Sequence, residues 1–152
     1  SETYPFQCNL AYQVPRKKEA DYIGKQALEA MRDKIEAGEK PYSNQLVGFT
    51  LGGKPIEEYA PDFWLISEDG STPIGYLTSP WYSPELGTNI AMGYVPYDKK
   101  AIGTSFKIHL PDEYCDTPGT PVEGVIVDMP FRPSVNANAR ELAKDKGRDT
   151  AF

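Results

Sequence analysis

Residues 75–96, GYLTSPWYSPELGTNIAMGYVP, form the stretch that decides the fold of this chain. Two strand-like runs, residues 74–78 and 89–95, are joined by a link that holds Pro80, Pro84 and Gly87. Runs rich in β-branched and aromatic residues on either side of proline and glycine are typical of strands that turn back on each other. The stretch therefore predicts an antiparallel hairpin.

Similar runs lie on both sides of this hairpin, and the 14 prolines and 13 glycines of the chain concentrate in the links between them. Asp69-Gly70 is expected to make a tight hairpin turn after Ser67. Consecutive hairpins of this kind predict a mostly β fold, an antiparallel barrel or jelly roll. The expected strands are residues 46–51, 63–67, 74–79, 90–95, 105–110 and 122–129.

One helix is expected before the strands, at residues 24–37, because its apolar positions recur at helical spacing. Gly38 is placed to end it as a left-handed C-terminal residue. An extended piece is expected earlier, at residues 10–14. After the strands, residues 134–152 are charged, and a short helix that frays into disorder is expected there.

The composition limits the classes of function. A chain of 152 residues can bury a single core, and its net charge of -6 argues against nucleic acid as a partner. No apolar run approaches the roughly 20 residues that a membrane helix needs, so no membrane partner is expected. The N-terminal residues have neither a basic leader nor an apolar region, so no signal peptide is expected.

The residues that carry most catalytic and metal chemistry are few. Cys8 and Cys115 lie far apart without a C-x-x-C motif, and His109 is the one histidine, so no metal site is expected. His109 alternates with Ile108 and Leu110, which is more typical of a surface strand residue than of a catalyst. Reduced thiols fit a cytoplasmic or mitochondrial-matrix protein.

Carboxylate pairs occur at Glu57-Glu58 and Asp112-Glu113, each in a polar, turn-like stretch where a solvated surface pair is the better interpretation. No Ser-His-Asp order and no phosphate-binding glycine loop is present. We therefore expect no catalytic residue in this chain.

The hairpin stretch resembles the C-terminal barrel signature of the glycine-cleavage T-protein family, the folate-dependent aminomethyltransferases and their demethylase relatives. That signature has a Gly-x-x-Thr-Ser-Gly run, a Ser-Pro and an Ile-Ala-Met-Gly-Tyr-Val strand. The residues that match are Gly75, Thr78, Ser79, Ser83, Pro84 and 90–95, while Pro80 stands where the family commonly has Gly.

Two further matches extend the resemblance to both sides. Residues 5–14, PFQCNLAYQV, and residues 21–28, DYIGKQAL, are similar to the segments that join the family's folate-binding region to its barrel. Residues 129–133, MPFRP, are close to the Met-Pro-Phe-Val-Pro that ends many T-proteins. The three matches run in family order and cover the chain from Pro5 to Pro133.

Departures from the family pattern narrow the expected function. The family's Gly-x-Pro-Met-Arg segment has an arginine near the folate site, and Glu57 replaces it here. Glu57 would repel the carboxylates of the folate tail. A tyrosine that follows the family's final motif is also replaced, by Asn136. These changes leave room for the demethylase branch, including the dimethylsulfoniopropionate demethylases, whose linker is similar to residues 5–8.

The resemblance implies a role in moving a one-carbon unit from a small-molecule methyl or aminomethyl donor to N5 of tetrahydrofolate. The acidic residue that assists, and most of the pterin pocket, belong in the family to an N-terminal region outside this chain. By resemblance, residues 1–43 join that folate-binding region to a barrel at 44–133, and residues 134–152 form the tail. The expected function is a C-terminal portion that closes one side of the active site and is inactive alone. The alternative is a non-catalytic folate-binding or interaction module.

Trp81, Tyr82 and Arg132 are the candidate cofactor-binding residues. Adjacent aromatic side chains in a link between prolines are expected to touch something, either the N-terminal region or a ligand. Arg132 follows a Pro-Phe pair and can clamp a carboxylate or form a salt bridge across a domain interface. Both alternatives stay open for these residues.

Overall fold

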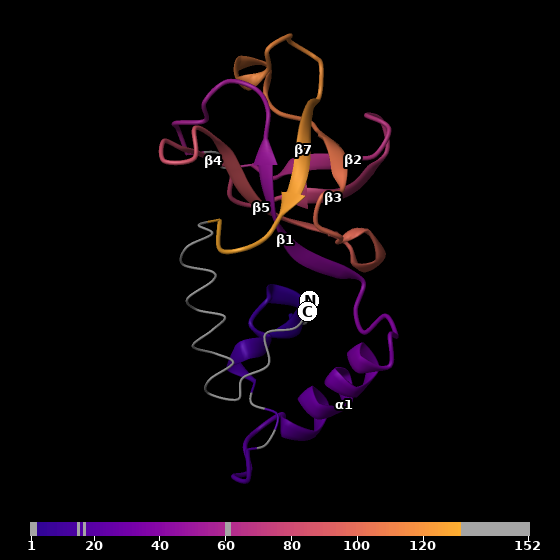
Figure 1. Cartoon of the computed structure of the whole chain (residues 1–152). Coiled ribbons are helices and arrows are strands. Elements are labelled where there is room, and N and C mark those ends of the chain that lie inside the picture. The colour runs from indigo at the N-terminus through magenta and orange to yellow at the C-terminus, as the bar shows by residue number, and fades with distance from the viewer. Residues whose placement is uncertain (1–2, 15, 17, 60–61, 132–152) are drawn as a thin grey trace. The chain divides into compact units, whose positions relative to one another are not determined.

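The computed structural model describes residues 3–14, 16, 18–59 and 62–131 (Figure 1). The described chain forms two compact units, one of residues before Asn44 and one of Asn44–Phe131. Among the described residues, none of the helices has the length and apolar character needed to cross a membrane.

The first unit holds two short 3-10 turns and the predicted helix, α1 (Lys25–Glu36). The helix begins after Gly24, whose φ of 85° is strained for any other residue. It ends at Glu36, and the φ of 75° at Gly38 turns the chain so that the N–H of Glu39 donates to the carbonyl of Lys34 at 2.9 Å. The prediction of the helix and of its C-terminal glycine is confirmed.

The extended piece predicted at residues 10–14 is wrong. The chain there forms the 3-10 turn η2 (Ala11–Gln13), preceded by η1 (Phe6–Cys8). Arg32 of α1 donates to the carbonyl of Val14 at 2.5 Å, and its guanidinium lies 5.5 Å from the centre of the Phe6 ring. These contacts with the helix hold residues 6–14 in compact turns. The local pattern that predicted an extended piece carries no information about contacts with a residue 18 positions away.

The second unit is a closed antiparallel barrel. Because β1 pairs with both β7 and β5, six strands close a ring in the order β1-β7-β6-β2-β3-β5. The ring confirms the predicted fold class, and each of the six predicted strands overlaps one observed strand. The strands are β1 (Asn44–Leu51), β2 (Trp64–Ser67), β3 (Pro73–Leu77), β4 (Trp81–Ser83), β5 (Thr88–Pro96), β6 (Ser105–Ile108) and β7 (Val122–Val127).

The interior of the barrel is filled by the inward side of each strand. The largest fully buried side chains include Phe49, Ile66, Leu77, Ile108 and Ile126, one from each of five strands. The alternating burial of β5 and β6 shows the period of two that sequence analysis relies on. Strands that are far apart in the sequence therefore pack against one another in a single core.

The link between the two signature strands contains a strand that sequence analysis missed. β4 pairs with β5 along the edge that β3 also uses, since β1 occupies the other edge of β5. Four residue steps separate Leu77 from Trp81, against three from Gly93 to Ile90, so the pairing slips by one residue. Pro80, which has no N–H to donate, lies inside this slip.

The turn after Ser67 is also longer than predicted. Ser67 is the register partner of Pro73, so residues 68–72 make the connection rather than Asp69 and Gly70 alone. The Asp69 carboxylate accepts the N–H groups of Ser71 at 2.8 Å and Thr72 at 2.9 Å. These bonds from one side chain stabilise a wider loop than a two-residue turn.

Because neighbouring strands of the ring run antiparallel, the connections gather at two ends of the barrel. One end, at the top of the second unit in Figure 1, collects the loop after β1, the β4–β5 turn and the connection from β6 to β7. We call this the hairpin end. It comprises residues 52–59, 62–63, 78–87 and 109–121.

Candidate functional site

The loop after β1 is pinned across the hairpin end by backbone bonds. The N–H of Gly52 donates to the carbonyl of Glu123 at 2.9 Å, and the N–H of Lys54 donates to that of Tyr114 at 2.8 Å. Gly53 has a φ of 87°, and a Cβ there would lie 2.5 Å from the carbonyl oxygen of Tyr114. The loop therefore needs glycine at this position to approach the β6–β7 connection.

Tyr82 joins the signature hairpin to this loop. Its N–H donates to the carbonyl of Ile56 at 2.8 Å, so the hairpin and the Glu57 segment are held side by side. The Trp81 side chain is 47% exposed and that of Tyr82 is half-buried. Two of the three candidate residues thus lie at one end of the barrel beside the segment that carries Glu57. Arg132, the third, lies outside the described residues, as does Asn136.

Asn89 is the residue at this end that sequence analysis missed. It begins the inward-facing alternation of β5, and it is 2% exposed. Its side-chain oxygen accepts the N–H of Ile56 at 3.0 Å, and its amide nitrogen donates to the carbonyls of Lys54 at 2.9 Å and Gly52 at 3.3 Å. A polar residue at an inward position of an apolar strand was the available signal.

The hairpin end is strongly acidic. Lys54 is the one lysine or arginine within residues 52–63, 78–87 and 109–121. Burial, and then the nearby Glu113 and Glu58 carboxylates, raise the pKa of Tyr114 above its ordinary value. Glu113 and Glu58, from two different connections, therefore act on one side chain. The carboxylates of this end as a whole outnumber its single lysine and favour cationic over anionic groups. They are Glu57, Glu58, Asp62, Glu85, Asp112, Glu113 and Asp116.

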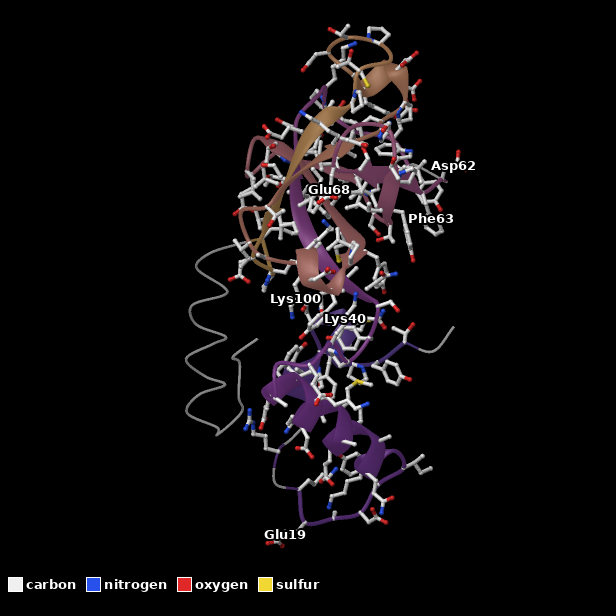
Figure 2. The ribbon with its side chains drawn as sticks, turned by 90° about the vertical axis from the view of Figure 1, so that its right-hand side faces the viewer. Glu19, Lys40, Asp62, Phe63, Glu68 and Lys100 are labelled. Atoms are coloured by element: carbon white, nitrogen blue, oxygen red, sulfur yellow. The ribbon has the colours of Figure 1, made fainter. Side chains whose placement is uncertain are left out.

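Exposed apolar side chains accompany these carboxylates. Tyr59 is 81% exposed and Phe63 is 66% exposed, and Figure 2 labels Phe63 with Asp62 at the surface of the second unit. The Phe63 ring lies 5.4 Å from that of Tyr76. Tyr59 and Phe63 therefore leave apolar surface exposed next to Glu58 and Asp62 in the chain.

His109 lies just beyond β6 and is half-buried rather than on the open surface as predicted. Its Nε2 is 2.8 Å from the hydroxyl oxygen of Ser67, which is itself fully buried. A hydroxyl that no substrate can reach is not a nucleophile, so the pair serves packing. Within the described part of the chain, no three His, Cys, Asp or Glu side chains are grouped to hold a metal ion.

Cys115 is buried beside this end of the barrel. Its thiol lies 3.6 Å from the carbonyl oxygen of Leu110 and 3.5 Å from that of Pro111. Burial raises the pKa of the Cys115 thiol, which keeps it protonated and unreactive.

Residues 44–131, which form the barrel, match the family model of the glycine cleavage T-protein C-terminal barrel domain. The chain belongs to the glycine cleavage T-protein family. The family predicted from the sequence is thereby confirmed, as is the C-terminal barrel within it. Its relatives are transferases by name.

Individual T-protein relatives match over most of the chain. An aminomethyltransferase of Halothermothrix orenii is 34% identical over 129 residues, which are 85% of this chain and 31% of the relative. The mitochondrial aminomethyltransferase of Solanum tuberosum is 31% identical over 134 residues, which are 87% of this chain and 29% of the relative.

A solved structure gives the same result. The glycine cleavage system aminomethyltransferase T of Bartonella henselae matches with a TM-score of 0.63 and 25% identity, over 86% of this chain and 32% of that one. The chain therefore spans about a third of the length of the relatives that it matches.

Proposed function

We propose that this chain is the C-terminal portion of a tetrahydrofolate-dependent methyl or aminomethyl transferase, and that its hairpin end closes one side of an active site built by an N-terminal folate-binding region. Membership of the T-protein family supports the proposal. The observation that carries it is the hydrogen bond from the Tyr82 N–H to the Ile56 carbonyl. It holds the family's signature hairpin and the Glu57 segment together at one end.

Trp81 and Tyr82 are proposed to contact the folate ring system. When bound, tetrahydrofolate would accept the one-carbon unit at N5. The exposed Trp81 ring fits a flat aromatic group, because stacking removes apolar area from water. The carboxylates of the hairpin end do not fit the anionic glutamate tail, and Glu57 repels it. The tail would therefore point away from this end, and Arg132 is the proposed basic contact for a carboxylate elsewhere.

The donor is proposed to be a small molecule that carries a methyl or aminomethyl group. The enzyme is proposed to be either of the T-protein type or a demethylase of the dimethylsulfoniopropionate type, for which Glu57 leaves room because it stands where the family has arginine. The group that assists at the reacting nitrogen would come from the N-terminal region. This chain would help to bind and orient tetrahydrofolate and would exclude water from the site. The proposed location of the protein is the cytoplasm or a mitochondrial matrix.

The test is a titration of the ¹⁵N-labelled chain with tetrahydrofolate, followed by amide chemical shifts. We expect shifts confined to residues 52–58 and 81–88. Trp81→Ser combined with Tyr82→Ser should weaken binding at least about tenfold, since each buried aromatic contact contributes roughly 1.5–3 kcal/mol. Leu65→Ser is the matched control, because Leu65 is 46% exposed but lies mid-strand in β2.

Binding that survives the double variant, or shifts that fall elsewhere on the barrel, would contradict the proposed contact. A pentaglutamate tail that strengthens binding at the hairpin end would contradict the orientation of the tail. We expect no transfer of a methyl group from dimethylsulfoniopropionate by this chain alone. Such transfer would show instead that the barrel contains its own catalytic group.

A further inference from the structure

The peptide groups on both sides of Ile56 are held by one cross-strand pair of residues. Tyr82 of β4 and Asn89 of β5 are register partners. Asn89 accepts the Ile56 N–H through its side chain, and Tyr82 donates its own N–H to the Ile56 carbonyl. The position of the loop is therefore tied to the register of the signature hairpin.

The Asn89 side chain uses both ends of its amide on this loop. Its oxygen holds one N–H, and its nitrogen donates to the carbonyls of Gly52 and Lys54. An amide can accept and donate at once, whereas a carboxylate accepts only and an alkyl group does neither. Since Asn89 and Ile56 are both buried, water does not replace these bonds when one is lost.

We infer that Asn89 is a positioning residue, which fixes the position of Glu57 relative to Tyr82 at the hairpin end. Through this position it sets the affinity of the hairpin end for its ligand. The inference rests on the proposed function for the identity of that ligand. Its structural part, the control of the loop by Asn89, does not. Asn89 acts through Ile56, the residue next to Glu57, and not by touching the ligand.

Hydrogen exchange at the Ile56 amide measures the positioning directly. Asn89→Ala removes the acceptor of that amide, so its exchange should become about tenfold to a hundredfold faster after correction for global stability. Ser67→Ala is the matched control. Ser67 is a fully buried polar residue with side-chain bonds to Lys107 and His109, away from this loop.

A second variant, Asn89→Asp, separates positioning from simple loss of packing. The carboxyl group of this variant can still accept the N–H of Ile56. When it is ionised, its second oxygen faces the carbonyl oxygens of Gly52 and Lys54, to which the Asn89 nitrogen donates in the wild type. The neutral form is favoured there and can donate to one of them, so the pKa of the new carboxyl rises. Protection of Ile56 in this variant should increase as the pH falls from 7 to 4. In the wild type and in Ser67→Ala it should stay constant over that range.

The ligand part is measured by the tetrahydrofolate titration of the same chain. Asn89→Ala should weaken binding about tenfold or more, and Ser67→Ala should leave it unchanged. Ile56 protection equal to that of the wild type in Asn89→Ala would overturn the inference. Faster exchange with unchanged folate affinity would overturn its ligand part. If the wild-type chain does not bind tetrahydrofolate, the proposed contact fails, while the exchange data still decide the positioning.

Discussion

Gly75 of β3 lies where no side chain fits. A Cβ built on Gly75 would stand 2.1 Å from the carbonyl oxygen of Tyr94 on β5, whereas ordinary contacts begin at 3.4 Å. Gly75→Ala would therefore force β3 and β5 apart by about 1.3 Å at that point. The neighbouring register pairs Tyr76↔Tyr94 and Leu77↔Gly93 are the whole pairing of these two strands.

The cost follows from what this separation breaks. Losing two backbone hydrogen bonds costs about 1 kcal/mol each, and loosening the buried Leu77 adds about 1 to 2 kcal/mol. The smaller backbone entropy of alanine in the unfolded chain offsets up to about 1 kcal/mol. We expect Gly75→Ala to lower the free energy of unfolding by about 2–4 kcal/mol. The melting temperature should fall by about 10–20 °C.

Urea unfolding followed by tryptophan fluorescence measures this loss, because Trp64 is 6% exposed and is the register partner of Leu77. Gly48→Ala is the matched control. Its Cβ would meet Met129 Cγ at 2.6 Å and Phe131 Cε1 at 3.0 Å, which are side-chain atoms that can move. We expect a loss of at most about 1 kcal/mol there. If Gly75→Ala lowers the free energy of unfolding by no more than Gly48→Ala does, the close approach of β3 and β5 at Gly75 does not limit the side chain there.

Two other predictions concern single titratable groups. Hydrogen bonds from Thr72 and Ser71 lower the Asp69 pKa from 3.8 to about 2. The stability that the Asp69 carboxylate adds to the folded state is therefore complete above pH 4 and is lost as the pH falls through about 2. Asp69→Asn should therefore flatten the decline in the free energy of unfolding between pH 4 and pH 2, and an unchanged decline would contradict these bonds. Because Cys115 is 1% exposed with a raised thiol pKa, a thiol reagent at pH 8 should modify half-buried Cys8 first. Equal rates in the folded chain would mean that the Cys115 region opens easily.

The strands were predictable because their inward and outward positions alternate within a few residues. β5 shows this most clearly, with Ala91 and Val95 buried and Met92 exposed. The helix was predictable for the same local reason, with Gly38 as its end. β4 was not, because a strand of three residues between Pro80 and Pro84 carries too little alternation. Its pairing depends on β5, which the local pattern cannot report.

The candidate site was predictable only in part. Trp81 and Tyr82 were singled out because adjacent aromatic residues in a link between prolines are expected to be exposed and to make a contact. That they adjoin Glu57 was not visible, since Tyr82 and Ile56 are 26 positions apart and meet through a backbone bond. Asn89 was missed because its three bonds go to residues more than 30 positions away.

The sequence by itself determined the helix, the six strands of the ring and the family. Local periodicity sets strands and helix, and the signature stretch with its flanking segments identifies the T-protein barrel. Only the tertiary structure decided the closure of the ring through β1 and β5 and the compact turn at Ala11–Gln13. It also decided that the loop with Glu57 lies against the hairpin, through the hydrogen bond between Tyr82 and Ile56. Each of these depends on contacts between residues far apart in the chain, whose energies come from shared burial and hydrogen bonding and not from any short run of residues.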